Sequence, residues 1–139
     1  MIVLDTNVIS EVFKPQPDLN VVAWLETFNG DIAITTITLA EMLAGVRRLP
    51  DGHRKSMLVA GIDRAIQPYR DTNAILAFDE SAAEHYASIV ASRERSGAPI
   101  TMADAQIAAI CRSRQAVCAT RNTKDFAGTG VVLINPWSL

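Results

Sequence analysis

Short apolar runs alternate along this chain with longer segments in which apolar residues recur every three or four positions. The short runs predict five strands, at residues 2–4, 32–35, 74–78, 116–119 and 131–134. Short runs of this kind, without polar alternation, are typical of strands that are buried on both faces of a sheet.

The longer segments predict helices, because their apolar side chains would gather on one face at a period of 3.6 residues. Pro68 is expected to stop the helix that is predicted over residues 53–67, since an interior proline removes a backbone hydrogen bond. A turn is predicted at residues 29–31. The helices are expected from about residue 7 to Pro15, over residues 19–29, from Thr38 to Leu49, over residues 53–67, over residues 80–96, and from Thr101 to about Arg114.

Strands that alternate with helices predict an α/β fold with a mostly parallel five-stranded sheet covered on both faces. Residues 1–139 have the length of a single domain and show no linker or repeat. In such sheets, functional sites gather at the carboxyl ends of the strands. This edge is therefore where candidate functional residues should be sought.

Composition narrows the class of protein. Hydrophobic residues make up 49% of the chain and charged residues 20%, which provides a core and argues against disorder. No apolar run approaches the roughly 18 residues that cross a bilayer, and no signal peptide is evident, so a cytoplasmic location is expected. Cys111 and Cys118 are expected to be reduced, buried thiols.

Four acidic residues that are distant in sequence fall at the predicted carboxyl edge of the sheet. Asp5 directly follows the first strand. Glu41 is expected in the first turn of the helix after the second strand, and Asp104 in the first turn of the helix before the fourth. Asn122 and Asp125 follow the fourth strand. Helix N-termini and strand C-termini point to the same edge in this fold, so these side chains should converge.

Converging carboxylates raise one another's pKa unless a cation lies among them. Oxygen ligands without nearby His or Cys favour Mg²⁺ or Mn²⁺ over zinc. An ion of this kind activates a water molecule and neutralises charge on a phosphodiester. The pattern therefore indicates metal-dependent hydrolysis of a phosphodiester.

Each acid also has a structural interpretation. The spacings at residues 38–41 and 101–104 fit capping boxes, and Asp125 could cap a turn. Asp5 is harder to explain in this way, because it directly follows a buried strand and no basic residue lies within eight positions. A buried charge of that kind needs a partner from elsewhere in the fold.

The segments that hold these acids resemble the motif set of the PIN-domain ribonucleases. The resemblance rests on MIVLDTNVIS at residues 1–10, TLAEMLAGV at 38–46, ITMADAQIAAI at 100–110 and ATRNTKDF at 119–126. It extends in particular to the VapC and FitB toxins of bacterial toxin–antitoxin pairs. It implies a PIN-like three-layer α/β/α sandwich.

The resemblance also implies roles for individual residues. Asp5, Glu41 and Asp104 correspond to acidic metal-site residues of the family. Asp125 is implied as the fourth acid, with the neutral Asn122 as its hydrogen-bonding neighbour. Thr6, Asn7 and Thr120 fall where the family keeps polar residues around the metal ligands.

At the level of function, the resemblance implies a homodimeric, Mg²⁺- or Mn²⁺-dependent endoribonuclease. It implies an antitoxin partner that inserts a basic residue into the acidic pocket and binds operator DNA through its other end. The formal net charge of -2 is unusual for a protein that binds RNA. We expect a basic rim to offset it, formed by groups at residues 47–55, 93–95 and 112–114.

Two other functions are compatible with parts of this pattern. A phosphatase with an aspartyl nucleophile also begins with an acid after a strand, but it needs a second acid two positions later, where this chain has Asn7. A catalytically silent PIN-like module that only binds an antitoxin or DNA is the second alternative. The intact acids argue against that module.

Overall fold

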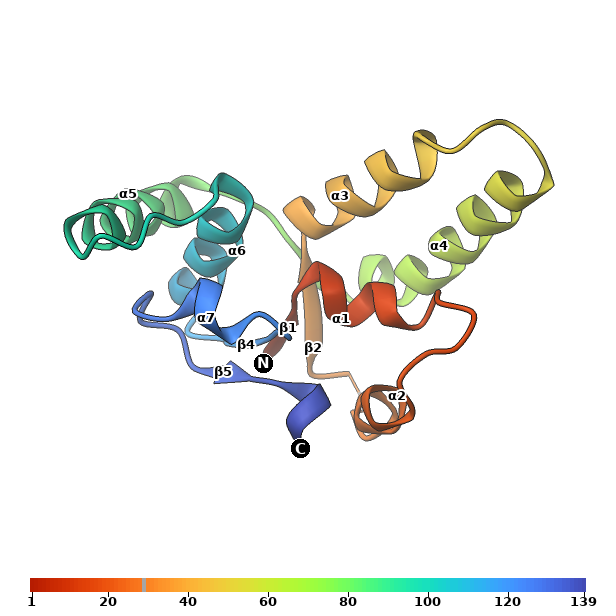
Figure 1. Cartoon of the computed structure of the whole chain (residues 1–139), viewed down its shortest axis with the longest axis horizontal. Coiled ribbons are helices and arrows are strands. Elements are labelled where there is room, and N and C mark those ends of the chain that lie inside the picture. Colours follow the sequence, from red (N-terminus) through yellow and green to blue (C-terminus); the bar gives the residue numbers. More distant parts are fainter. Residues whose placement is uncertain (29) are drawn as a thin grey trace.

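The computed structural model describes residues 1–28 and 30–139 (Figure 1). Asn29, part of the turn predicted at residues 29–31, lies outside the described residues. The strands are β1 (Ile2–Leu4), β2 (Ile32–Thr35), β3 (Ile75–Leu76), β4 (Val117–Ala119) and β5 (Leu133–Ile134). The helices are α1 (Thr6–Glu11), α2 (Leu19–Glu26), α3 (Thr36–Arg47), α4 (His53–Asp71), α5 (Glu80–Arg95), α6 (Met102–Ser113), α7 (Thr123–Phe126) and the 3₁₀ helix η1 (Pro136–Ser138).

The five predicted strands form one sheet in the order β3-β2-β1-β4-β5. Each described pairing is parallel, and β1 lies in the centre, where Ile2 pairs with both Ile32 and Val117. The predicted α/β class with a five-stranded sheet is confirmed, and the sheet is wholly parallel. Its carboxyl edge therefore brings together the residues that follow β1, β2 and β4.

Helices cover both faces of this sheet, as the three-layer prediction requires (Figure 1). One apolar core combines the sheet with α5, α6 and Phe126 of α7, and it contains Cys111 and Cys118 as free, buried thiols. The other core combines the sheet with α1, α2, α3 and α4. Among the described helices, none has the length and apolarity needed to cross a bilayer.

The third helix begins earlier than its sequence pattern indicates. Thr35, the last residue of β2, caps α3 by accepting a hydrogen bond of 3.1 Å from the backbone N–H of Thr38. The strand thus passes directly into the helix, and Thr38 lies inside the first turn with its side chain buried. Glu41 is the sixth residue of α3 and lies in the second turn, so the predicted first-turn position is wrong.

The fourth helix continues past Pro68 to Asp71, contrary to the prediction that Pro68 stops it. Only the last turn lies beyond the proline, so few backbone hydrogen bonds are affected. Side chains stabilise this turn: Gln67 donates a 2.8 Å hydrogen bond to Asp71, and Thr72 donates one of 2.9 Å to the Pro68 carbonyl.

Candidate active site

Asp5 joins β1 to α1 and has its carboxylate almost wholly inside the protein. Its relative exposure is 5%. Its Oδ1 accepts a 2.8 Å hydrogen bond from the backbone N–H of Thr6, which makes Asp5 the N-cap of α1. Its Oδ2 accepts hydrogen bonds from Thr120 Oγ1 at 2.7 Å and from Asn7 Nδ2 at 3.2 Å. The predicted polar neighbours Thr6, Asn7 and Thr120 therefore all contact this carboxylate.

The surroundings of Asp5 raise its pKa above the ordinary value. Burial has the largest effect, because a charge is costly to remove from water. The hydrogen bonds from Thr120 and Thr6 act in the opposite direction, and the carboxylates of Asp104 and Glu41 raise the pKa further. Asp5, Asp104 and Glu41 thus interact electrostatically at one edge of the sheet, as the sequence predicts.

Glu41 reaches this edge from the second turn of α3. Its Oε1 accepts a 2.8 Å hydrogen bond from Thr6 Oγ1, and that hydroxyl also lies 3.0 Å from Oγ1 of the buried Thr38. Because Thr35 rather than Thr38 caps the helix, the capping-box interpretation of Glu41 does not hold. Its carboxylate is exposed to solvent and is bonded to the residue that follows Asp5.

Asp104 lies half-buried in the first turn of α6. Thr101 caps this helix by accepting a 3.3 Å hydrogen bond from the Asp104 backbone N–H, so the predicted cap at Thr101 is confirmed. Burial raises the pKa of the Asp104 carboxyl, a hydrogen bond to Thr101 lowers it, and the nearby charges of Asp125 and Glu41 raise it again.

The segment after β4 holds the remaining predicted residues in a short helix rather than an open loop. Asn122 precedes α7, and its backbone N–H donates a 3.1 Å hydrogen bond to Thr120 Oγ1. Asp125 lies exposed within α7, and its backbone N–H donates a 3.0 Å hydrogen bond to the Asn122 carbonyl. Asp125 acts electrostatically on Asp104. Through Thr120, this helix is connected to Asp5.

Within residues 1–28 and 30–139, none of the four acids forms an ion pair with Lys, Arg or His. Across the same residues, no three His, Cys, Asp or Glu side chains form a compact metal-binding cluster. The carboxylates are thus close enough to raise one another's pKa but are not drawn together at one point.

The basic groups that were predicted to form a rim lie in different surroundings, and the charge of one of them, Arg93, lowers the pKa of Asp104. Arg93 is 8% exposed and donates hydrogen bonds to the carbonyls of Ala98, Asp125 and Ala127 at 2.6, 2.8 and 2.9 Å. Residues 112–114 lie at the end of α6 opposite Asp104. Arg48, which follows the last residue of α3, lines a surface hollow together with Glu41.

A further basic residue, Arg121, which the sequence pattern did not single out, follows the residue that holds Asp5. Its backbone N–H donates a 3.3 Å hydrogen bond to Asn7 Oδ1. It directly follows Thr120 in the ATRNTKDF segment, and that adjacency was the available signal.

Comparison with known proteins agrees with this geometry. The PIN domain family model matches residues 2–131. Toxin FitB of Neisseria gonorrhoeae is 41% identical over 138 residues, covering 99% of each chain. VapC ribonuclease Y4jK of Sinorhizobium fredii is 37% identical, covering 99% of this chain and 98% of the relative. A solved structure of FitAB bound to an IR36 DNA fragment superimposes with a TM-score of 0.94 at 41% identity, covering 100% of this chain and 97% of that one.

A parallel sheet with acids at its carboxyl edge, together with a family match over nearly the whole chain, makes this protein a member of the PIN-domain family. Within that family it belongs to the VapC/FitB group of toxins. The resemblance inferred from the sequence motifs is confirmed.

Proposed function

We propose that this chain is an endoribonuclease whose acidic edge holds Mg²⁺ or Mn²⁺, and that it acts as the toxin of a toxin–antitoxin pair. The observation that carries the proposal is the state of Asp5. Its carboxylate is buried, and two further carboxylates raise its pKa without a positive partner among the described residues. A divalent cation would neutralise this charge.

The residues present fit such an ion. Asp5, Glu41 and Asp104 would hold it, with Asp125 as the fourth acid, and all of them offer the oxygen ligands that Mg²⁺ and Mn²⁺ prefer. Mg²⁺ keeps several of its water molecules, so the carboxylates need not form a closed cage. When bound, the ion would lower the pKa of a water molecule and neutralise charge on the scissile phosphodiester.

The neighbouring polar residues would orient the acids. Thr120 and Asn7 fix Oδ2 of Asp5, and the cap bond from Thr6 fixes Oδ1. Thr6 also holds Glu41 through its hydroxyl, so one residue positions two acids. Such surrounding hydrogen bonds set the orientation and basicity of metal ligands. We assign Asn122 a weaker role, since it acts on Asp5 only through Thr120.

Neither alternative function is favoured. An aspartyl-phosphatase mechanism would need an acid at Asn7, and the Asn7 amide instead donates its hydrogen bond to Asp5. A silent module would not need to keep four acids at the cost of raised pKa values for Asp5 and Asp104.

The proposal includes an antitoxin partner, operator DNA reached only through that antitoxin, a homodimer and a cytoplasmic location. Support comes from the similarity to FitB in the FitAB complex bound to DNA.

An apolar cleft of about 290 Å³ also opens beside Thr6 and Glu41, with Phe13, Met42 and Leu58 in its lining. We propose that the antitoxin occupies this cleft and places its basic residue among the acids.

The test is cleavage of total bacterial RNA by the purified chain with Mg²⁺ or Mn²⁺, with the product ends mapped. Wild type should cut, and Asp5→Asn and Asp104→Asn should each abolish cleavage while the circular dichroism spectrum stays native. Arg114→Ala, at the far end of α6, is the matched control and should cut like wild type. Cleavage that persists in Asp5→Asn would indicate a contaminating nuclease, and inactivity of folded wild type with either ion would favour the silent module.

A further inference from the structure

Arg121 is an exposed cation that directly follows Thr120, the residue that holds Asp5, and its side chain lies over an aromatic ring. Its guanidinium carbon lies 5.1 Å from the centroid of the Trp137 ring. Trp137 is half-buried and packs against the core formed with α1 to α4, so it provides a fixed surface. The C-terminal segment is thereby connected to the residue that follows Thr120.

The donors of this guanidinium are available to a ligand. Among residues 1–28 and 30–139, the Arg121 side chain makes no hydrogen bond or ion pair, and only its backbone N–H is engaged, with Asn7. A guanidinium that lies over a ring still presents its N–H groups, which form a planar fork. This geometry suits bidentate binding of a phosphate.

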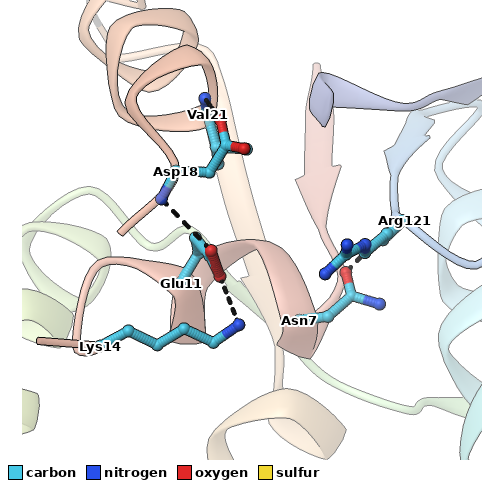
Figure 2. A network of polar contacts seen from close by, with 6 residues as sticks. All are labelled: Asn7, Glu11, Lys14, Asp18, Val21 and Arg121. Atoms are coloured by element: carbon cyan, nitrogen blue, oxygen red, sulfur yellow. Dashed lines mark hydrogen bonds and ion pairs between the residues drawn. The ribbon is translucent and has the colours of Figure 1, made fainter. Parts of the chain in front are cut away.

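The residues of α1 that lie near Arg121 do not form an ion pair with its guanidinium. Figure 2 shows its side chain extending towards α1 beside Asn7, with Glu11 one turn further along the helix. The Glu11 carboxylate is already held by Lys14 at 2.8 Å and by the backbone N–H of Asp18 at 3.3 Å. A hydrogen bond to Lys14 is the main cause that lowers the Glu11 pKa, and the charge of Arg121 contributes least.

We propose that Arg121, supported by Trp137, binds a phosphate of the RNA strand next to the scissile one. This inference rests on the proposed ribonuclease function. Arg121 follows Thr120, which holds Asp5, and its backbone is bonded to Asn7, which also contacts Asp5. The residue thus starts one contact away from Asp5, and its long side chain can reach a phosphate that adjoins the scissile one. Arg121 would thus supply positive charge that an overall acidic protein needs for an anionic substrate.

The experiment measures binding rather than cleavage. A fluorescent single-stranded RNA 12-mer is titrated by anisotropy into full-length Asp5→Asn protein with Mn²⁺, at several KCl concentrations. Adding Arg121→Ala should weaken binding about tenfold and reduce the slope of log K against log salt by about 0.7, the value for one lost phosphate contact on a single strand. Arg121→Lys should keep the slope of log K against log salt and weaken binding less than Arg121→Ala. Lysine retains the positive charge but lacks the paired N–H donors of the guanidinium. Arg114→Ala removes an equal charge at the far end of α6 and should match the parent.

The outcomes separate this inference from the function on which it rests. An unchanged affinity and slope for Arg121→Ala on a parent that binds RNA would overturn the role of Arg121 alone. The same loss in Arg114→Ala would show a general charge effect and also overturn it. A lowered Tm for Arg121→Ala with RNA binding retained would show that the contact with Trp137 is only structural. If neither this parent nor wild type binds RNA with Mn²⁺, and wild type cleaves none, the ribonuclease function itself is contradicted.

Discussion

Thr120 donates a hydrogen bond of 2.7 Å to Oδ2 of Asp5 across a sequence separation of 115 residues, and both side chains are buried. The same hydroxyl accepts the backbone N–H of Asn122. One threonine thus links the end of β1 to the segment that carries Asp125. We take this contact as the main support of the acidic site, because it stabilises the ionised form of Asp5 against the effect of burial.

Thr120→Val tests this contact, since valine keeps the shape and removes the hydroxyl. The Asp5 carboxylate loses a donor and the Asn122 N–H loses an acceptor, so we expect a loss of stability of about 1–3 kcal/mol. Metal affinity should fall about 10- to 100-fold. Denaturant unfolding and Mn²⁺ titration measure the two effects. Thr120→Ser keeps the hydroxyl and should stay close to wild type; equal losses in both variants would show that packing, not the hydrogen bond, is responsible.

Asp104→Asn should stabilise the metal-free protein, although it removes activity. The substitution removes a half-buried charge whose pKa is raised by burial and by Asp125 and Glu41. Because part of this charge is screened by solvent, we expect a gain of only about 0.5 kcal/mol at pH 7, or an increase of about 1–2 °C in Tm. Thermal unfolding in a chelator measures it. A clear decrease in Tm would mean that Asp104 is a structural residue.

The gain from Asp104→Asn should depend on pH. A carboxyl with a raised folded pKa contributes stability while it is protonated, and that contribution is lost as the pH rises through the folded value. The difference in the free energy of unfolding between Asp104→Asn and wild type should therefore be smallest below pH 4 and grow towards pH 7. Glu11, whose pKa is lowered, has the opposite dependence but is common to both proteins and cancels. A difference that is constant between pH 4 and pH 7 would contradict the raised pKa.

Asp125 and Asn122 should have unequal roles in metal binding. Asp125 is exposed and acts on Asp104, so Asp125→Asn should raise the Mn²⁺ concentration for half-maximal cleavage about tenfold and leave much of the rate at saturating metal. Asn122→Ala should have a smaller effect, because the contact from this residue to Thr120 is made by its backbone. A larger effect for Asn122→Ala would reverse the assignment of the fourth acid.

The strands and the convergence of the acids were predictable because both follow from local rules. Apolar runs between helical segments imply a parallel sheet, and parallel strands bring the residues after them to one edge. The motif at residues 1–10 placed Asp5 at that edge, and the structure has it there as the cap of α1. The residues that contact the Asp5 carboxylate were implied by family resemblance alone.

What could not be predicted depends on choices between nearly equivalent local contacts. Threonines at positions 35, 36 and 38 can all cap a helix, and the hydrogen bond that forms is the one from the Thr38 N–H to Thr35. Arg93 and Arg121 look alike in sequence. Arg93 is buried and donates hydrogen bonds to three carbonyls. The Arg121 side chain lies over Trp137, which is near the end of the chain. Only tertiary packing distinguishes the two arginines.

The central claim is that Asp5, Glu41 and Asp104 together hold a divalent cation. Calorimetric titration of Mn²⁺ into the metal-free protein, with Asp104→Asn and Asp5→Asn in parallel and Arg114→Ala as control, tests it without reference to RNA. We predict saturable binding by wild type and Arg114→Ala, a stabilisation of about 2.7 kcal/mol at 100 times the Kd, and loss of binding in both acid variants. Equal Mn²⁺ binding by wild type and by the two acid variants would contradict the claim.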